Sequence, residues 1–276
     1  MLPALLVYCC VVVLPALYTA FLSLFKWNGL GEKKFVLFRN YVNLFTTDAV
    51  FKTALKNNII WIILTLLFTM TIALLLAMLL NRKFKGRVVY RAIFYFPYML
   101  SWIVIGIIWK WIYNPNIGFL DSLLNLLGIQ TSGAGWLSDP KIALYCVFAA
   151  ALWQGVQPML YFLAGLQGIP QELYEAAAVD GAGKVATFFN VTIPQLKETF
   201  VIVLATLVIA SLKVYDVVYV MTNGGPVNST QTLASYMYAQ TFSYSNLGTG
   251  SAIVVVMMVM MMVIIIPYVL YTTKDE

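Results

Sequence analysis

Six long apolar runs, separated by polar stretches, constrain the fold of this chain more than any other feature of its sequence. About 20 apolar residues are enough for a helix to cross the hydrocarbon core of a bilayer. Helices also satisfy their own backbone polar groups, as lipid requires. We therefore predict an all-α polytopic membrane protein in which residues 1–276 form a single transmembrane domain. The predicted spans cover approximately residues 2–25, 57–80, 92–113, 141–167, 199–222 and 249–272.

The first apolar run also has the position of a secretory signal peptide. It is too long for one, lacks a basic leader and has no small-residue cleavage site after it. We therefore predict that this run is a membrane span.

The composition agrees with a chain that lies in lipid and carries no active site. Hydrophobic residues make up 62% of the chain and charged residues 10%, whereas soluble domains average about 25% charged residues. There is no histidine, the commonest general base and metal ligand. Cys9, Cys10 and Cys146 lie in apolar runs without metal-binding spacing. We therefore predict no catalytic residue and no metal site. We also predict no nucleic-acid partner, because the basic residues of a membrane protein mostly set its topology.

The orientation rests on the short loop at residues 82–91, which holds five basic residues and no acidic one. The positive-inside rule places such a loop in the cytoplasm. Alternation then places the 168–198 loop and both termini there as well. The 26–56 loop, which this orientation places outside, is evidence against it because the loop is also rich in basic residues. It is longer, however, and also contains Glu32 and Asp48, so the short basic loop is given more weight. The six basic residues of the 26–56 loop are Lys26, Lys33, Lys34, Arg39, Lys52 and Lys56.

Two outer segments carry local signals of structure. The leucine spacing over residues 120–127 favours a short amphipathic helix at the interface. Residues 223–226, Asn-Gly-Gly-Pro, predict a turn that ends the fifth span.

The 168–198 loop is polar yet patterned for helix. Pro170 can begin a helix whose early turns hold Glu172 and Glu175, and a Gly-Ala-Gly break at residues 181–183 follows. A second segment then leads to Pro194, which marks a boundary. This predicts a helix–turn–helix below the membrane, which either only links two spans or presents a surface to a partner.

The same segment is not a nucleotide site. The phosphate-binding motif G-x-x-x-x-G-K-[ST] requires glycine at position 178 and serine or threonine at 185, and it follows a strand. The chain has Ala178 and Val185 there.

Polar side chains at membrane depth are candidates for a transport path, because they are costly in lipid. In the fourth span three of them share one helical face with a tryptophan beside them, and in the fifth span three others share a face. Helix–helix hydrogen bonds, or an ion pair between Lys213 and Asp216, would explain them equally. The candidates are Trp153, Gln154, Gln157, Tyr161, Asp216, Tyr219 and Asn223.

The order Glu-Ala-Ala-x3-Gly-x9-aliphatic-x-aliphatic-Pro at residues 175–194 resembles the signature loop of the membrane subunits of bacterial binding-protein-dependent ABC importers. The amino-acid sequence of residues 169–183 is similar to that of the carbohydrate branch of this family, the maltose and multiple-sugar permeases. The resemblance extends over almost the whole chain. Its further matches are residues 40–45, 113–115, 153–154, Asp216, 222–226 and 247–248.

This resemblance implies an ABC type I importer permease fold with a cytoplasmic coupling helix, in the bacterial plasma (inner) membrane. The coupling residues it implies are Glu175, Ala176, Ala177, Asp180 and Gly181, with Pro194 directing the return to the membrane. The chain departs from the family's pattern at Val191 and Ile193, and only Lys184 is basic between residues 181 and 191.

The resemblance also implies the partners. These are a second homologous permease, two ATP-binding subunits that hold the ATP and magnesium, and an extracytoplasmic solute-binding protein, all beside membrane lipid. The chain itself would bind no cofactor and would translocate a sugar or related polar solute by alternating access.

Two other classes compete with this interpretation. An ion-coupled secondary transporter or channel would need intramembrane acids, and Asp216 is the plausible one. A membrane-embedded enzyme is disfavoured by the missing histidines. The sequence does not name the solute, since oligosaccharides, monosaccharides and glycerol phosphates are carried by similar permeases.

Overall fold

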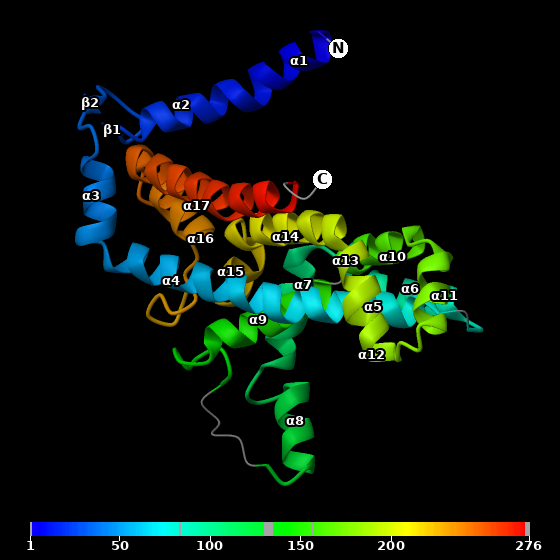
Figure 1. Cartoon of the computed structure of the whole chain (residues 1–276). Coiled ribbons are helices and arrows are strands. Elements are labelled where there is room, and N and C mark those ends of the chain that lie inside the picture. The colour runs from blue at the N-terminus through cyan, green and yellow to red at the C-terminus, as the bar shows by residue number, and fades with distance from the viewer. Residues whose placement is uncertain (1, 83, 130–134, 156, 274–276) are drawn as a thin grey trace.

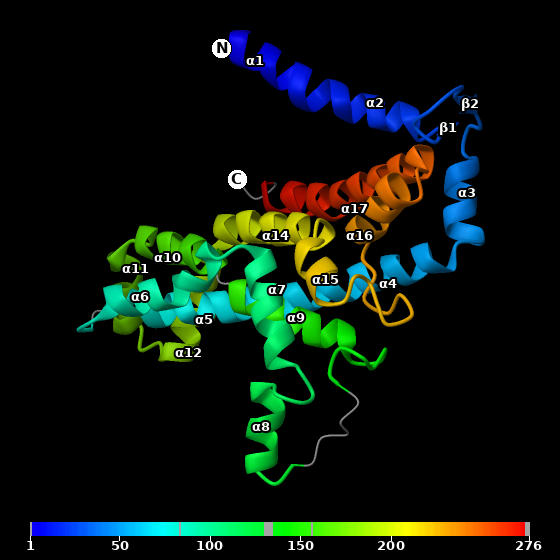
Figure 2. The same cartoon turned by 180° about the vertical axis from the view of Figure 1, so that it is seen from behind.

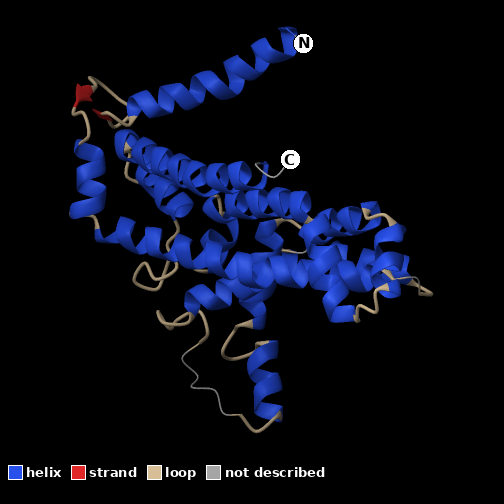
Figure 3. Cartoon of the chain, in the orientation of Figure 1, coloured by secondary structure: helices blue, strands red, loops and turns tan. Residues whose placement is uncertain are grey.

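The computed structural model describes residues 2–82, 84–129, 135–155 and 157–273, and this part of the chain is almost entirely helical (Figures 1 and 3). Its sheet is a two-stranded antiparallel hairpin of β1 (Phe25–Lys26) and β2 (Lys34–Phe35). Lys83, which contributes to the predicted basic loop, and the end of the predicted cytoplasmic C-terminus lie outside the described residues.

Four continuous helices in the described part are long and apolar enough to cross a membrane. Two bent helix pairs bring the number to six if each pair is one span. The four are Leu2–Leu22, Ala49–Asn81, Lys197–Met221 and Leu247–Tyr271.

The first span consists of α1 (Leu2–Tyr8), the π turn η1 (Cys9–Val13) and α2 (Leu14–Leu22). It diverges from the rest of the bundle (Figures 1 and 2). Only 6% of the residues in its most apolar 18-residue stretch are buried. After the β hairpin, α3 (Arg39–Thr46) leads into the second span.

The second helix is longer than the predicted 57–80 span. It joins α4 (Ala49–Leu64), the π turn η2 (Thr65–Thr69) and α5 (Met70–Asn81) into 33 residues. The Asp48 side chain accepts the Phe51 N–H at 2.9 Å and so begins this helix. At 1.5 Å per residue it is about 50 Å long, so it projects beyond a hydrocarbon core of about 30 Å.

The predicted third span, 92–113, is present as a bent pair of helices. The chain forms α6 (Arg87–Tyr95), the 3₁₀ turn η3 (Phe96–Met99) and α7 (Trp102–Ile112), and the two halves meet at 95°. The bend has a local cause, because Pro97 cannot continue the α-helical hydrogen bonding. Ser101 then caps the N-terminus of α7 by accepting the Val104 N–H at 3.3 Å. The predicted interfacial helix follows as α8 (Phe119–Leu126).

The predicted fourth span, 141–167, is also interrupted. It consists of α9 (Ala143–Gln154) and α10 (Pro158–Gly168), whose axes differ by 46°. A Cβ at Gly155 would lie 2.9 Å from Cγ2 of Thr69, so glycine lets the break lie close against the second helix. Beyond it, α10 packs against α5 and α14 around Phe162 and Leu196, which are fully buried.

The two ends of the bundle hold different structures (Figures 1 and 2). The 168–198 segment and the start of α6 lie at one end, and the β hairpin and α3 lie at the other. The last helices of the fold are α11 (Gln171–Val179), α12 (Lys184–Thr187), η4 (Phe188–Thr192), α13 (Ile193–Gln195), α14 (Lys197–Leu212), α15 (Asp216–Met221), α16 (Leu233–Tyr238), η5 (Ala239–Ser243) and α17 (Leu247–Thr273).

Two adjacent asparagines of α4 hold the segment between α14 and α16 in place. Asn58, which is fully buried, donates to the Ser211 carbonyl at 2.9 Å and accepts the Leu233 N–H at 2.6 Å. Asn57 donates to the carbonyls of Ser229 and Gln231 at 2.8 and 2.9 Å. These bonds satisfy backbone groups that the irregular segment leaves free.

The same segment is tied to the start of the second helix by a phenol–carboxylate bond. Tyr236 donates to Asp48 Oδ2 at 2.6 Å, and Gln240 Nε2 donates to the Tyr236 oxygen at 2.6 Å. Burial, reinforced by the Asp48 carboxylate, raises the pKa of Tyr236 above its usual range. The shift widens the pH range over which the phenol is protonated and can donate to Asp48.

Replacing Asn58 with leucine should destabilise the fold, because the Ser211 carbonyl and the Leu233 N–H would both lose their partner inside the bundle. Each buried unpaired group costs about 1–3 kcal/mol. We expect the apparent melting temperature in detergent to fall by about 5–10 °C. Asn125→Leu on the exposed face of α8 is the matched control, and an equal fall in both variants would contradict this role.

Candidate functional site: an exposed hairpin and two polar pockets

The predicted helix–turn–helix is present as α11, a glycine turn and α12. Gly181 has φ +75°, in the left-handed region, and ends α11. The Ala182 N–H donates to the Ala177 carbonyl at 2.9 Å, and the Gly181 N–H donates to the Ala178 carbonyl at 3.1 Å. This pair of bonds is the Schellman motif, which favours glycine at this position. Gly181 is therefore needed for the turn itself, whatever binds there.

One side of the hairpin is anchored to the bundle. The hydroxyls of Tyr174 and Thr192 are 3.3 Å apart and join α11 to η4. Phe188, Ile193 and Ile169 pack against the core formed by α5, α10 and α14.

The other side of the hairpin is uncovered and partly apolar. Val179, Val185 and Phe189 are 88%, 71% and 61% exposed. Exposed apolar side chains gathered beside small residues are typical of a surface that a partner covers.

Most of the predicted coupling residues lie on this surface. Glu175, Ala176, Asp180 and Gly181 are exposed, and Ala177 is half-buried. Glu175 is held by Gln171, whose Nε2 donates to its carboxylate at 2.9 Å. The structure places Pro194 in the single turn α13, exposed, where the chain re-enters the bundle as α14.

A small pocket of about 110 Å³ lies inside the bundle, where three helix interruptions meet. It is lined by Thr65 and Thr69 of the π turn, Trp102 beside the 95° bend, and Gly155 and Pro158 at the break of the fourth span. Of the predicted path residues, Gln154 and Gln157 line this pocket.

The two polar atoms of the Gln154 side-chain amide differ in their contacts. Its Nε2 donates to the Leu100 carbonyl at the bend between η3 and α7. Within the described residues its Oε1 has no hydrogen-bond partner, and neither does Oγ of Ser211, which lines the same pocket. Buried polar atoms without partners are unusual in proteins, so these two oxygens are available to a polar group that enters the pocket.

The other two candidates of the fourth span do not line this pocket. Tyr161 accepts a hydrogen bond from Gln157 Nε2 at 3.1 Å. Trp153 is 39% exposed, and its ring meets that of Trp109 edge-on at 6.2 Å.

A larger pocket of about 480 Å³ lies beside α15 and α16. Tyr219 and Asn223, two of the three residues predicted to share one face of the fifth span, both line it. Tyr215 stacks on Tyr219, with ring centroids 5.3 Å apart, and Tyr238 lies 4.8 Å from Tyr215. Phe242 extends this aromatic wall.

The sequence interpretation missed the aromatic residues from η5 and its surroundings. Tyr238, Phe242 and Tyr244 alternate with polar residues in a segment that is not a predicted span. The number of aromatic residues in this short segment was the available signal. Its position beside α15 depends on long-range bonds, among them those from Asn57 and Asn58 and the bond from Thr232 to the Val214 carbonyl.

Asp216 does not share this pocket with Tyr219. It is exposed at the first residue of α15, and within the described chain it forms no ion pair with Lys213. The alternative that Lys213 and Asp216 neutralise each other is therefore not what the structure shows. Among the described residues, no group of three or more His, Cys, Asp or Glu could hold a metal ion.

Comparison with known proteins connects this architecture to a family. Residues 69–273 match the binding-protein-dependent transport system inner membrane component family. The chain belongs to this family. The match covers the C-terminal part of the second helix, both bent spans, the α11–α12 hairpin and most of the residues that line the two pockets.

Individual relatives agree with this assignment. A probable ABC transporter permease of Pyrococcus horikoshii is 35% identical, over 100% of this chain and 95% of the relative. The trehalose/maltose transport system permease MalF of Thermococcus litoralis is also 35% identical, over 91% of this chain and 85% of the relative.

The fold is that of a solved importer. A bacterial ABC transporter involved in the import of the acidic polysaccharide alginate includes a chain that superposes with a TM-score of 0.82, at 22% identity, covering 99% of this permease and 93% of that chain. The bend at the third span and the exposed hairpin therefore belong to an ABC importer permease fold. The chain is a multi-pass membrane subunit of an ABC importer, and ATP hydrolysis belongs to a separate subunit.

Replacing Gly181 with alanine should loosen the hairpin, because alanine at positive φ costs roughly 1–2 kcal/mol. We expect the Ala182 amide, which donates across the turn, to exchange hydrogen about tenfold faster. Gly183→Ala is the matched control, since Gly183 has φ −70° and no atom near an added Cβ. Equal exchange in the two variants would show that the left-handed turn is not what position 181 requires.

Proposed function

We propose that this permease moves a sugar or related polar solute across the plasma membrane by alternating access, driven by two ATP-binding subunits, one of which docks on the α11–α12 hairpin. The observation that carries the proposal is the uncovered apolar side of α11 and α12 on an arm anchored to the bundle. Docking would bury this surface, and a movement of the docked subunit would reach α10 and α14 through Tyr174, Phe188 and Ile193.

The proposed orientation has the hairpin in the cytoplasm. The start of α6, in the basic 82–91 loop, lies at the same end of the bundle as the hairpin (Figures 1 and 2). Both termini would then be cytoplasmic, and the β hairpin and α3 would face the solute-binding protein. ATP and magnesium would be held by the ATP-binding subunits, with no cofactor on this chain.

A second, homologous permease would complete the translocation path. The first span supports this, because its apolar faces are exposed and it leaves the bundle of its own chain. Such a helix is covered by lipid or by another membrane subunit.

The two pockets define the proposed path. The aromatic pocket offers flat ring faces from Tyr215, Tyr219 and Tyr238 together with the Asn223 amide, a combination that suits the apolar faces and hydroxyls of a sugar. The inner pocket offers the free oxygens of Gln154 and Ser211. The solute would meet the aromatic pocket first and the inner pocket at the helix breaks second. The trehalose/maltose permease relative supports a sugar as the solute.

Ala176→Trp should prevent docking, because Ala176 is exposed on α11 and an indole there would hold the two backbones apart. We expect at least a tenfold loss of the ATP-binding subunit that copurifies with this chain, with membrane insertion unchanged. Asn125→Trp on α8 is the control. Normal copurification of the Ala176 variant, or uptake by this chain without any ATP-binding subunit, would refute the proposed coupling.

Tyr219→Ala should reduce uptake of the solute about tenfold or more, since burying the apolar area of an aromatic side chain is worth about 1.5–3 kcal/mol. Tyr219→Phe should keep most of the uptake because it keeps the ring. The solute is first identified as the ligand of the binding protein encoded beside this chain, and its ATP-dependent uptake is then measured. Tyr145→Ala, on the exposed face of α9, is the control. An effect of Tyr219→Phe as large as that of Tyr219→Ala would argue against stacking.

A further inference from the structure

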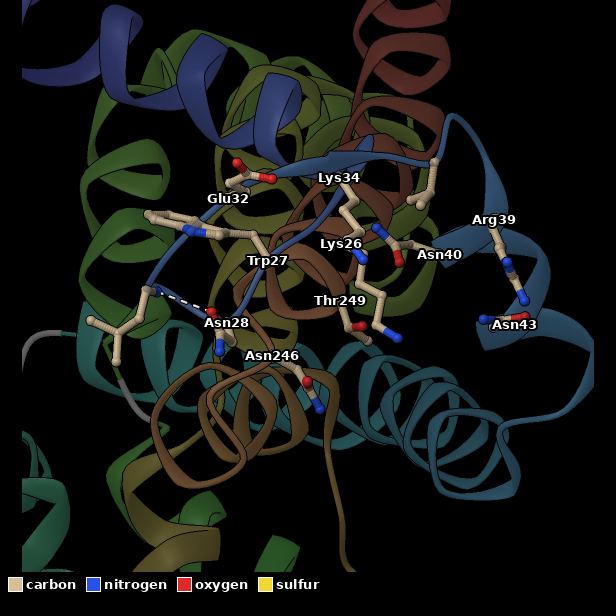
Figure 4. Close-up of a pocket in the computed structure, with 12 residues that line it drawn as sticks. Lys26, Trp27, Asn28, Glu32, Lys34, Arg39, Asn40, Asn43, Asn246 and Thr249 are labelled. Carbon is tan, nitrogen blue, oxygen red and sulfur yellow. Dashed lines mark hydrogen bonds between the residues drawn. The ribbon is translucent and has the colours of Figure 1, made fainter.

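A basic pocket of about 620 Å³ lies at the end of the bundle opposite the α11–α12 hairpin, beside the β hairpin. It is formed by β1, β2, α3 and the start of α17 (Figure 4). Lys26, Lys34 and Arg39 line it, with the polar side chains of Asn246 and Thr249. Glu32 is the acidic residue of the lining.

The cations of this pocket are placed where they destabilise the free protein. Lys26 and Lys34 are direct partners across the β hairpin, and like charges at such positions repel. Arg39 is the first residue of α3, where the positive end of the helix dipole disfavours a cation. Within the described residues, none of the three forms an ion pair with a carboxylate. A bound anion would relieve all three unfavourable placements.

The walls of the pocket are fixed by contacts that leave these three cations free to bind. Lys33, the neighbouring lysine, is already committed, since its ammonium donates to the Tyr18 hydroxyl at 2.8 Å and lies 4.5 Å from the Trp27 ring. Asn40 Nδ2 donates to the carbonyls of Ser23 and Phe25 at 2.7 and 2.9 Å, and these bonds join α3 to the β hairpin. The site is therefore preformed.

The pocket lies at the level where apolar helices end. α2 ends at Leu22 and α17 begins at Leu247, and the two helices diverge from this point (Figures 1 and 2). Leu17 and Phe21 on α2 are 61% and 52% exposed. A group bound in the pocket would thus lie at headgroup depth, next to an apolar surface that acyl chains can cover.

We propose that this pocket binds the phosphate group of an anionic phospholipid, with the acyl chains along the exposed face of α2. Phosphate is the anion that both lipid headgroups and solution supply, and the position at the helix ends favours the lipid. The proposal holds for either orientation of the chain. It also gives a role to basic residues of the 26–56 loop, whose charge opposes the orientation indicated by the 82–91 loop.

The test measures lipid retention by the full chain purified in detergent. The protein is incubated with radiolabelled phosphatidylglycerol or phosphatidylcholine, separated by gel filtration, and the retained lipid is counted. We expect selective retention of phosphatidylglycerol and at least a tenfold loss in the double variant Lys26→Gln/Lys34→Gln. The double variant Lys52→Gln/Lys56→Gln removes the same charge at the same end, outside the pocket, and should retain the lipid. The charge-preserving double variant Lys26→Arg/Lys34→Arg should also retain it.

Two outcomes would overturn the proposal. Equal retention by the two glutamine double variants would show that only the overall charge of this end matters. If millimolar inorganic phosphate displaces phosphatidylglycerol, and binds by itself with the same loss on Lys26→Gln/Lys34→Gln, the site belongs to a soluble anion and not to a lipid.

Discussion

The need to satisfy backbone groups inside an apolar environment controls this structure. A straight membrane helix satisfies its own N–H and C=O groups, but every interruption frees some of them, and lipid offers no replacement. Three of the irregular places in the described chain have an amide side chain beside them. Gln154 donates to the carbonyl at the 95° bend, Asn58 serves the carbonyl before the α14–α15 break and the N–H that begins α16, and Asn40 serves two carbonyls before and within β1. These amides are what allow the chain to be irregular where its pockets lie.

The same arrangement explains why function and structure share residues. The inner pocket exists because three helices are interrupted at one level, and the amide that stabilises one bend leaves its oxygen free toward that pocket. A solute bound there would contact the residues on which the bend depends. Binding and helix geometry are therefore coupled in one site, which suits a protein that must change conformation around its solute.

Much of the fold could be predicted because membrane spans and the hairpin are specified locally. A run of twenty apolar residues, or a glycine separated by three residues from a Glu-Ala-Ala sequence, can be recognised from the local sequence alone. The 95° bend was not predictable, because Pro97 permits a continuous kinked span as readily as a right-angled one, and the outcome depends on Gln154, more than 50 residues later. The aromatic pocket was only half predicted, since Tyr219 and Asn223 share a helix face, whereas Tyr238 and Phe242 arrive through contacts with α4. Pairings over such sequence separations leave no local pattern.

The second helix keeps one direction through its π turn, from Asp48, beside Tyr236, to Asn81 near the α11–α12 end of the bundle. It is therefore long enough to reach both faces of the membrane. Because it is about 50 Å long, a tilt of about 5° around one end displaces the other by about 4 Å. A small rotation produced by docked subunits on one side would in this way open or narrow the aromatic pocket on the other, without any local rearrangement of the rings that line it.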